Sequence, residues 1–93
     1  MNIKEFLLES GVYPNLLGFN YLERAVELAK QKGKIQVYNG IYEQIVVENN
    51  STKLRVERAI RTVIEHIKLE DFKKIGINKR LTNGQFIYFF ARR

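Results

Sequence analysis

The residues of this sequence best suited to recognition chemistry stand within one stretch, NNSTKLRVERAIRTVIEH, residues 49–66. Arg55, Arg58 and Arg61 recur there every three residues, and Glu57 stands among them. An arginine fork can span both major-groove acceptors of guanine, while a carboxylate can accept a hydrogen bond from the amino group of cytosine. Because Glu57 would oppose phosphate binding alone, the mixed set indicates contact with base edges as well as phosphates.

A helix is needed to present these side chains together, and the pattern of the stretch predicts one. Its apolar residues recur every three or four positions, which is the strongest helical periodicity in the chain. They are Val56, Ala59, Ile60, Val63, Ile64 and Ile67. We therefore expect a helix over residues 51–67, capped by Ser51 or Thr52. The face opposite the apolar stripe carries Leu54, Arg58, Arg61 and Glu65, with Arg55 and Glu57 at its flanks.

This charged face has two interpretations. If it contacts bases, its guanidinium groups point outward and are unpaired with the protein itself. Leu54 could then touch a thymine methyl group, since recognition helices use their N-terminal residues for base contact. Alternatively, Glu57 and Arg61 form an ordinary i, i+4 ion pair on a solvated surface, which contributes about 0.3 kcal/mol.

The segment before this helix suggests how it is held. Residues 38–48 have helical spacing, although their β-branched residues keep a strand possible, and the polar turn NNST follows. Two helices joined by so short a turn have the outline of a helix-turn-helix, here at residues 38–67.

Glycine and asparagine punctuate the remainder of the chain. A short helix is predicted near the start, and a longer one after Asn20, which forms a capping arrangement with Glu23. Thr82 and Gln85 form another capping pair before the aromatic run FIYFFARR, which could also be a strand. We therefore expect an all-α protein, a single compact bundle of about five to six helices that forms one domain over residues 1–93.

Composition narrows the functional classes. The chain has 93 residues, no cysteine and a formal net charge of +6, so disulfides, thiol catalysis and cysteine-ligated zinc are excluded. Residues 1–50 hold five Lys/Arg against six Asp/Glu, whereas residues 51–93 hold eleven against four, giving −1 and +7. Such a basic half favours a polyanionic partner, either nucleic acid or an anionic membrane surface, although basic residues also confer solubility. Without a membrane-spanning run or a secretion signal, a soluble cytoplasmic protein is expected.

The sequence predicts no enzyme, no metal site and no cofactor. His66 is the only histidine, and its place near a helix end favours a structural role over that of a ligand or a base. The glycine spacing of a phosphate loop is missing. The aromatic run could stack on bases, but a small domain needs large side chains to bury enough apolar area, so core packing is favoured.

Several segments also resemble a known family. RVERAIRTVIEH, preceded by a Ser/Thr turn, resembles the recognition helix of the C-terminal DNA-binding effector domain of the response regulator that initiates sporulation in endospore-forming bacteria. GFNYLERAVELA resembles an early helix of that domain, YEQIVVENNST its first helix-turn-helix helix and turn, and LTNGQFIYFFA its closing helix. The likeness covers most of residues 11–91. Lys53 and Leu54 depart from the small residues expected at the beginning of the recognition helix, and the chain begins at Met1 without the family's usual receiver domain.

The resemblance implies a cytoplasmic transcriptional regulator that binds double-stranded DNA with residues 51–67 in the major groove, with a homodimer or tandem copies on the DNA. Together with the charged face, it gives an expected DNA-binding set of Ser51, Thr52, Lys53, Leu54, Arg55, Glu57, Arg58, Arg61 and Thr62. One alternative is a protein-interaction module that keeps the fold and modulates a full-length regulator without specific DNA binding. Another is non-specific nucleic-acid binding, which is indifferent to sequence and steeply weakened by salt.

Overall fold

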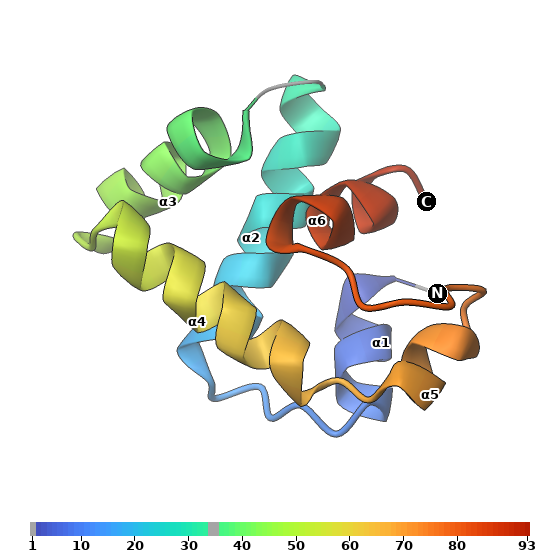
Figure 1. The fold of residues 1–93 in the computed structure, drawn as a ribbon. Helices are drawn as coiled ribbons and strands as arrows, with labels where there is room; N and C mark the ends of the chain where they lie inside the picture. The colour runs from blue at the N-terminus through green and yellow to red at the C-terminus, as the bar shows by residue number, and fades with distance from the viewer. Residues whose placement is uncertain (1, 34–35) are drawn as a thin grey trace.

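The computed structural model of the protein describes residues 2–33 and 36–93, most of which are helical (Figure 1). The elements are α1 (Ile3–Glu9), α2 (Leu17–Lys32), the π-helical turn η1 (Val37–Ile41), α3 (Tyr42–Asn49), α4 (Lys53–His66), α5 (Leu69–Lys73) and α6 (Asn83–Ala91). The described residues contain no strand, so the all-α prediction is confirmed. None of their helices is long and apolar enough to cross a bilayer.

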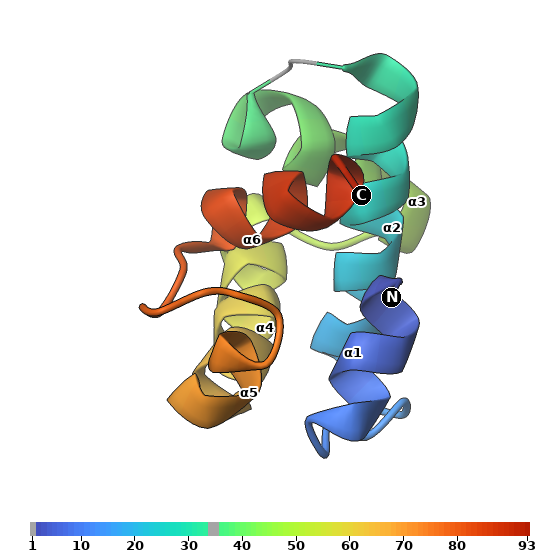
Figure 2. The same ribbon diagram turned by 90° about the vertical axis from the view of Figure 1, so that its right-hand side faces the viewer.

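Helix α2 is the centre of the packing. It contacts α1, α3, α4 and α6, and in the side view α6 runs across from α4 towards α2 (Figure 2). Because α2 meets neighbours on several sides, its buried residues are not confined to one narrow stripe. They are Gly18, Phe19, Tyr21, Leu22, Ala25, Val26, Leu28 and Ala29.

The beginning of α2 differs from the prediction. The helix starts at Leu17, with Leu16 in the capping position, so the prediction that Asn20 caps it is wrong. Asn20 is an exposed residue inside the first turns. The extra turn buries Phe19 almost completely, and the apolar area removed from water outweighs the capping signal.

Helices α2 and α4 approach each other closely at Gly18. A Cβ atom at this position would lie 2.1 Å from the carbonyl oxygen of Ala59 and 2.7 Å from a methyl carbon of Val63. Only glycine fits such a backbone approach. The contact brings the apolar stripe of α4 onto α2, and its predicted members are found buried or partly buried: Val56, Ala59, Ile60, Val63, Ile64 and Ile67.

The helix predicted over residues 38–48 is present but begins irregularly. The amide of Ile41 donates to the carbonyl of Gln36 at 3.2 Å, an i→i+5 bond that makes η1 a π-helical turn before α3. Asn50, with a φ of 50°, ends α3 in the left-handed region. Thr52 then caps α4. The two helices are therefore joined by three residues, as the predicted helix-turn-helix requires.

The aromatic run at the end of the chain is a helix and not a strand. The Thr82 side chain accepts from the amide of Gln85, and the Gln85 side chain accepts from the amide of Thr82, which completes the predicted capping box. The helix places its large side chains against α1 and α5. The buried rings that meet there belong to Phe6, Phe72, Phe86 and Phe90, so core packing is the main use of these aromatic residues.

Candidate nucleic-acid interface

The first turns of α4 form the exposed surface that the sequence singled out. Thr52 begins the helix by accepting a hydrogen bond from the amide of Arg55 at 3.2 Å, and this bond fixes the direction in which the following side chains leave the backbone. Leu54 is 49% exposed. Arg55 and Arg58 are also exposed, whereas Val56 between them is fully buried. The predicted division of this helix into a core face and an outer face is therefore present.

The guanidinium groups of Arg55 and Arg58 have no partner among the described residues. Within residues 2–33 and 36–93, neither guanidinium group takes part in an ion pair or a side-chain hydrogen bond. Both line an open hollow of about 550 Å³, together with the exposed Leu17 at the beginning of α2 and Asn50 and Ser51 of the turn. An unpaired guanidinium keeps all its donors available for an external acceptor.

Arg61 is different, because it is paired within the helix. Its Nη2 atom lies 2.8 Å from Oε1 of Glu57, and the two side chains are 54% and 30% exposed. The expectation that every guanidinium of this face is unpaired is therefore wrong for Arg61. The i, i+4 spacing of a glutamate followed by an arginine places the two groups within reach of each other.

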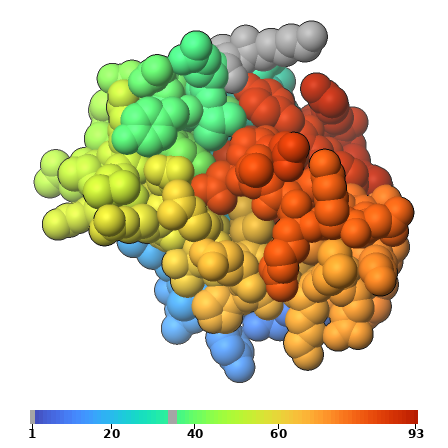
Figure 3. Space-filling model, viewed as in Figure 1, coloured from blue at the N-terminus to red at the C-terminus, as the bar shows by residue number. Residues whose placement is uncertain are grey.

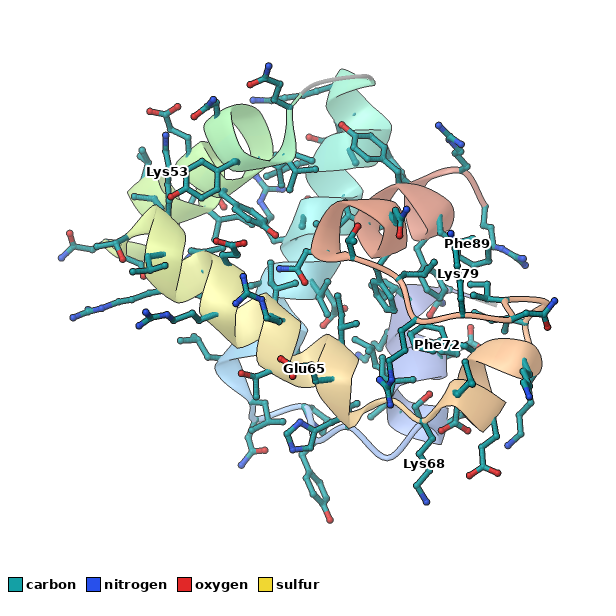
Figure 4. All side chains as sticks on the ribbon, viewed as in Figure 1. Lys53, Glu65, Lys68, Phe72, Lys79 and Phe89 are labelled. Atoms are coloured by element: carbon teal, nitrogen blue, oxygen red, sulfur yellow. The ribbon has the colours of Figure 1, made fainter. Side chains whose placement is uncertain are left out.

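Lys53 makes contacts that the sequence did not predict. Its Nζ atom donates to Oδ1 of Asn39 at 3.1 Å, lies 4.0 Å from a carboxylate oxygen of Glu43 and sits 5.2 Å from the ring centroid of Tyr38. Figure 4 shows Lys53 at the junction between the beginning of α4 and the elements before the turn. The lysine thus anchors the first turn of α4 to η1 and α3.

The remaining predicted residues surround this start. The Ser51 amide donates to the carbonyl of Val46 at 3.2 Å, and its side chain is half-buried beside the hollow. Thr62 is exposed one turn beyond Arg58. The carbonyl of Thr62 accepts a hydrogen bond from Nδ1 of His66 at 2.7 Å, so the only histidine closes the last turn of α4.

An ion pair between two charged side chains connects α3 to α2. Nε and Nη2 of Arg24 donate to the two carboxylate oxygens of Glu48 at 2.9 and 2.6 Å, and Arg24 also contacts Glu27. These hydrogen bonds, with a further one from Gln44, lower the pKa of Glu48 to about 2. Sequence reasoning missed this ion pair because Arg24 and Glu48 are far apart in the chain and carry no spacing signal.

The chain was compared with protein families and with curated proteins. The model of one protein family, described as sporulation initiation factor Spo0A C terminal, matches residues 3–93. No curated protein matches the chain. Among the described residues, no group of three or more histidine, cysteine, aspartate or glutamate side chains could hold a metal ion.

Proposed function

We propose, from the premise that this chain belongs to the Spo0A C-terminal family of sporulation initiation factors, that it binds duplex DNA sequence-specifically as a transcriptional regulator. The family consists of DNA-binding effector domains and is not an enzyme family. In this proposal residues 1–93 act as one domain, and α3, the turn and α4 act as its helix-turn-helix. The role places the protein in the cytoplasm, at the nucleoid.

One observation carries the proposal. The guanidinium groups of Arg55 and Arg58 have no partner among the described residues. Both arginines are exposed and stand in the first turns of a helix whose opposite face is buried. A helix in this position can enter the major groove with its N-terminal residues foremost. Two free guanidinium groups there supply the bidentate geometry that guanine recognition requires.

The other residues take supporting roles in this docking mode. Ser51 and Thr52 lie at the turn and can donate hydroxyl groups to backbone phosphates. Lys53 offers its charge to the same phosphates while it stays anchored to η1 and α3. Leu54 can contact a thymine methyl group, and Thr62 lies on the same exposed side farther along. Glu57 holds the guanidinium of Arg61 in one direction, so this pair would approach the duplex as a unit.

Selection from a random duplex pool tests the proposal most directly. We expect the purified protein to enrich a common sequence and to bind it 10³-fold or more tightly than a scrambled duplex, as specific DNA-binding proteins typically do at physiological salt. Fluorescence anisotropy gives both affinities. Two neighbouring half-sites in the enriched sequence would indicate that copies bind side by side.

Two results would overturn it. Equal affinity for the enriched and scrambled duplexes, with a steep loss in salt, would reduce the protein to a non-specific polyanion binder. Indifference to every duplex at low ionic strength would favour the alternative in which the fold serves only protein interaction.

A further inference from the structure

A second exposed surface lies on α6 and on the segment before it. It surrounds an open hollow of about 600 Å³. We call it the α6 surface, and its principal residues are Lys79, Leu81, Gln85, Phe89, Arg92 and Arg93. Leu81 and Phe89 are partly buried apolar side chains packed against the core. They give the hollow an apolar floor.

The rim of the α6 surface is positively charged. Lys79, Arg92 and Arg93 line it, and no aspartate or glutamate does. The side chains of Lys79 and Arg92 are exposed, and within the part of the chain that the structure describes they form no ion pair or side-chain hydrogen bond. An apolar floor inside a rim of three cations is complementary to an apolar side chain flanked by carboxylates.

This surface is separate from the candidate nucleic-acid interface. In Figure 4, Lys79 and Phe89 lie on the opposite side of the view from Lys53. The space-filling view shows the same separation, with the C-terminal segments gathered on one side and the beginning of α4 on the other (Figure 3). Occupation of the α6 surface is therefore compatible with contact between α4 and a duplex.

Three contacts argue against a nucleic acid as the occupant of this surface. The Arg93 guanidinium covers the Phe89 ring at 4.3 Å from its centroid, and it also donates to the carbonyl of Ile75 at 3.4 Å. Phe89 in addition meets the Phe90 ring at 5.2 Å in an edge-on geometry. A base would find this ring face occupied, although single-strand binders need it for stacking. Phosphates, for their part, would gain nothing from Leu81 at the floor.

From this combination we propose that the α6 surface docks an acidic peptide segment of a partner protein. An apolar side chain of the segment packs on Leu81, beside the Phe89 ring that Arg93 covers, and its flanking carboxylates pair with Lys79, Arg92 and Arg93. Pairs of opposite charge at the edge of an interface contribute to partner choice and to the rate of association. The inference concerns a surface distinct from α4 and stands whether or not the protein binds DNA.

Selection from a displayed library of random 12-residue peptides tests the proposal. We expect the immobilised protein of residues 1–93 to enrich peptides that carry several Asp or Glu residues around a leucine or an aromatic residue. The affinity of one enriched peptide is then measured by fluorescence anisotropy. Lys79→Glu and Arg92→Glu should each weaken binding about tenfold, because a rim charge is reversed and not merely removed. Both side chains are exposed, so the folded structure should survive, which circular dichroism checks.

Lys68→Glu is the matched control, since it makes the same change in net charge at an exposed site away from the hollow. Its peptide affinity should stay within about twofold of the unmodified protein, because Lys68 does not line the hollow and solvent and salt weaken the effect of an exposed charge. All three variants should lose the same small amount of affinity for duplex DNA, which separates this surface from α4.

Several outcomes would overturn the proposal. One is enrichment of peptides that are not acidic, and another is equal peptide affinity in all three variants. Competition between the peptide and a short duplex would show that the peptide binds at the arginines of α4 and not at the α6 surface. Concentration-dependent self-association that Lys79→Glu abolishes would make a second copy of the chain the occupant in place of a partner.

Discussion

At the scale of single residues, the arginines of α4 differ in how many guanidinium donors remain available to a ligand. Arg58 has no partner among the described side chains, whereas Arg61 already donates to Glu57. A duplex can engage Arg58 without breaking any contact of the protein. Engagement of Arg61 requires either its remaining donors or the loss of a surface ion pair, which is a small cost of at most about 1 kcal/mol. Base readout should therefore depend more on Arg58 than on Arg61.

Arg58→Ala tests this difference. We expect it to weaken binding to the selected duplex by roughly 1–3 kcal/mol and to relax the preference at one base pair, because a bidentate base contact is lost. Random duplexes should lose less affinity. Lys68→Ala, which removes an exposed charge far from the turn, is the control in the same anisotropy titration. Identical losses on selected and random duplexes would show that Arg58 contacts only phosphates.

Glu57→Gln addresses the role of the carboxylate. The substitution releases the Arg61 guanidinium and removes a negative charge that phosphates oppose. We expect affinity for random duplexes to rise and the slope of log K against log salt to steepen by about one phosphate contact. Discrimination between selected and scrambled duplexes should narrow, because the direction of Arg61 is no longer fixed. Unchanged salt dependence would mean that the pair faces solvent in the complex.

At the scale of the elements, the close approach of α2 and α4 holds α4 against the core. Gly18→Ala measures how much this contact contributes to the free energy of unfolding. The added methyl group would collide with the backbone at Ala59. Overpacking of this kind costs roughly 1–3 kcal/mol, and a backbone obstacle points to the upper end of that range. Urea unfolding gives the value.

Gly84→Ala provides the comparison for that experiment. A Cβ at Gly84 meets only a Val37 methyl at 3.5 Å, an ordinary contact, and alanine favours the helix by roughly 0.5–1 kcal/mol. This variant should therefore be as stable as the unmodified protein or slightly more stable. If both variants lost equal stability, the close packing of α2 on α4 would not be the cause.

The ion pair between Arg24 of α2 and Glu48 of α3 makes a pH-dependent contribution to the free energy of unfolding. The Arg24 side chain is the main cause of the lowered pKa of Glu48, about 2 against an ordinary value of 4.5. Because the folded state lowers this pKa, the stabilisation is complete above about pH 4.5 and is lost as the pH falls towards 2. The side chains are 32% and 28% exposed, so solvent screening limits the contribution to about 1 kcal/mol.

Glu48→Gln tests this contribution. At pH 7 the variant should unfold at lower urea concentration than the unmodified protein, and the difference between them should disappear near pH 2. The comparison is valid because both proteins share every other titrating group. A difference that stayed constant from pH 7 to pH 2 would show that the contact between Arg24 and Glu48 acts through packing and not through charge.

The sequence predicted the elements whose signals are local. The helical periodicity of the apolar residues predicted α4 and its buried stripe. The capping pair of Thr82 and Gln85 predicted where α6 begins. The sequence did not predict where α2 begins, because the burial of Phe19 outweighs the capping signal at Asn20. That burial depends on tertiary packing between helices that are distant in sequence, so no local pattern could reveal it.

The candidate site was predictable to a similar extent. Helical geometry identified the outward direction of Leu54, Arg55 and Arg58, because this follows from spacing alone. It left open whether Glu57 and Arg61 are paired, and the structure confirms the pair. The attachment of Lys53 to η1 could not be foreseen, since it depends on how the π-helical turn presents neighbouring side chains to the first turn of α4.

At the scale of the whole molecule, the two ends of the chain share one core. Phe6 of α1 lies 5.9 Å from Phe72 of α5 and 5.2 Å from Phe90 of α6, measured between ring centroids. The same core extends through α2 to the buried stripe of α4. We therefore expect the described helices to unfold together, as a single domain of this size usually does. Helical circular dichroism and tyrosine fluorescence should then report the same urea midpoint.

Phe72→Ala tests whether α5 and α4 unfold cooperatively through this shared core. Phe72 is fully buried in the short helix α5, and its truncation should cost about 3–5 kcal/mol through lost burial and a residual cavity. For a protein whose total stability is on the order of 5–15 kcal/mol, α4 should then lose stability along with α5. Hydrogen exchange would show it as an equal fall in protection of the α4 and α6 amides. Undiminished protection of α4 would mean that α5 unfolds locally and that the chain contains two independent cooperative units.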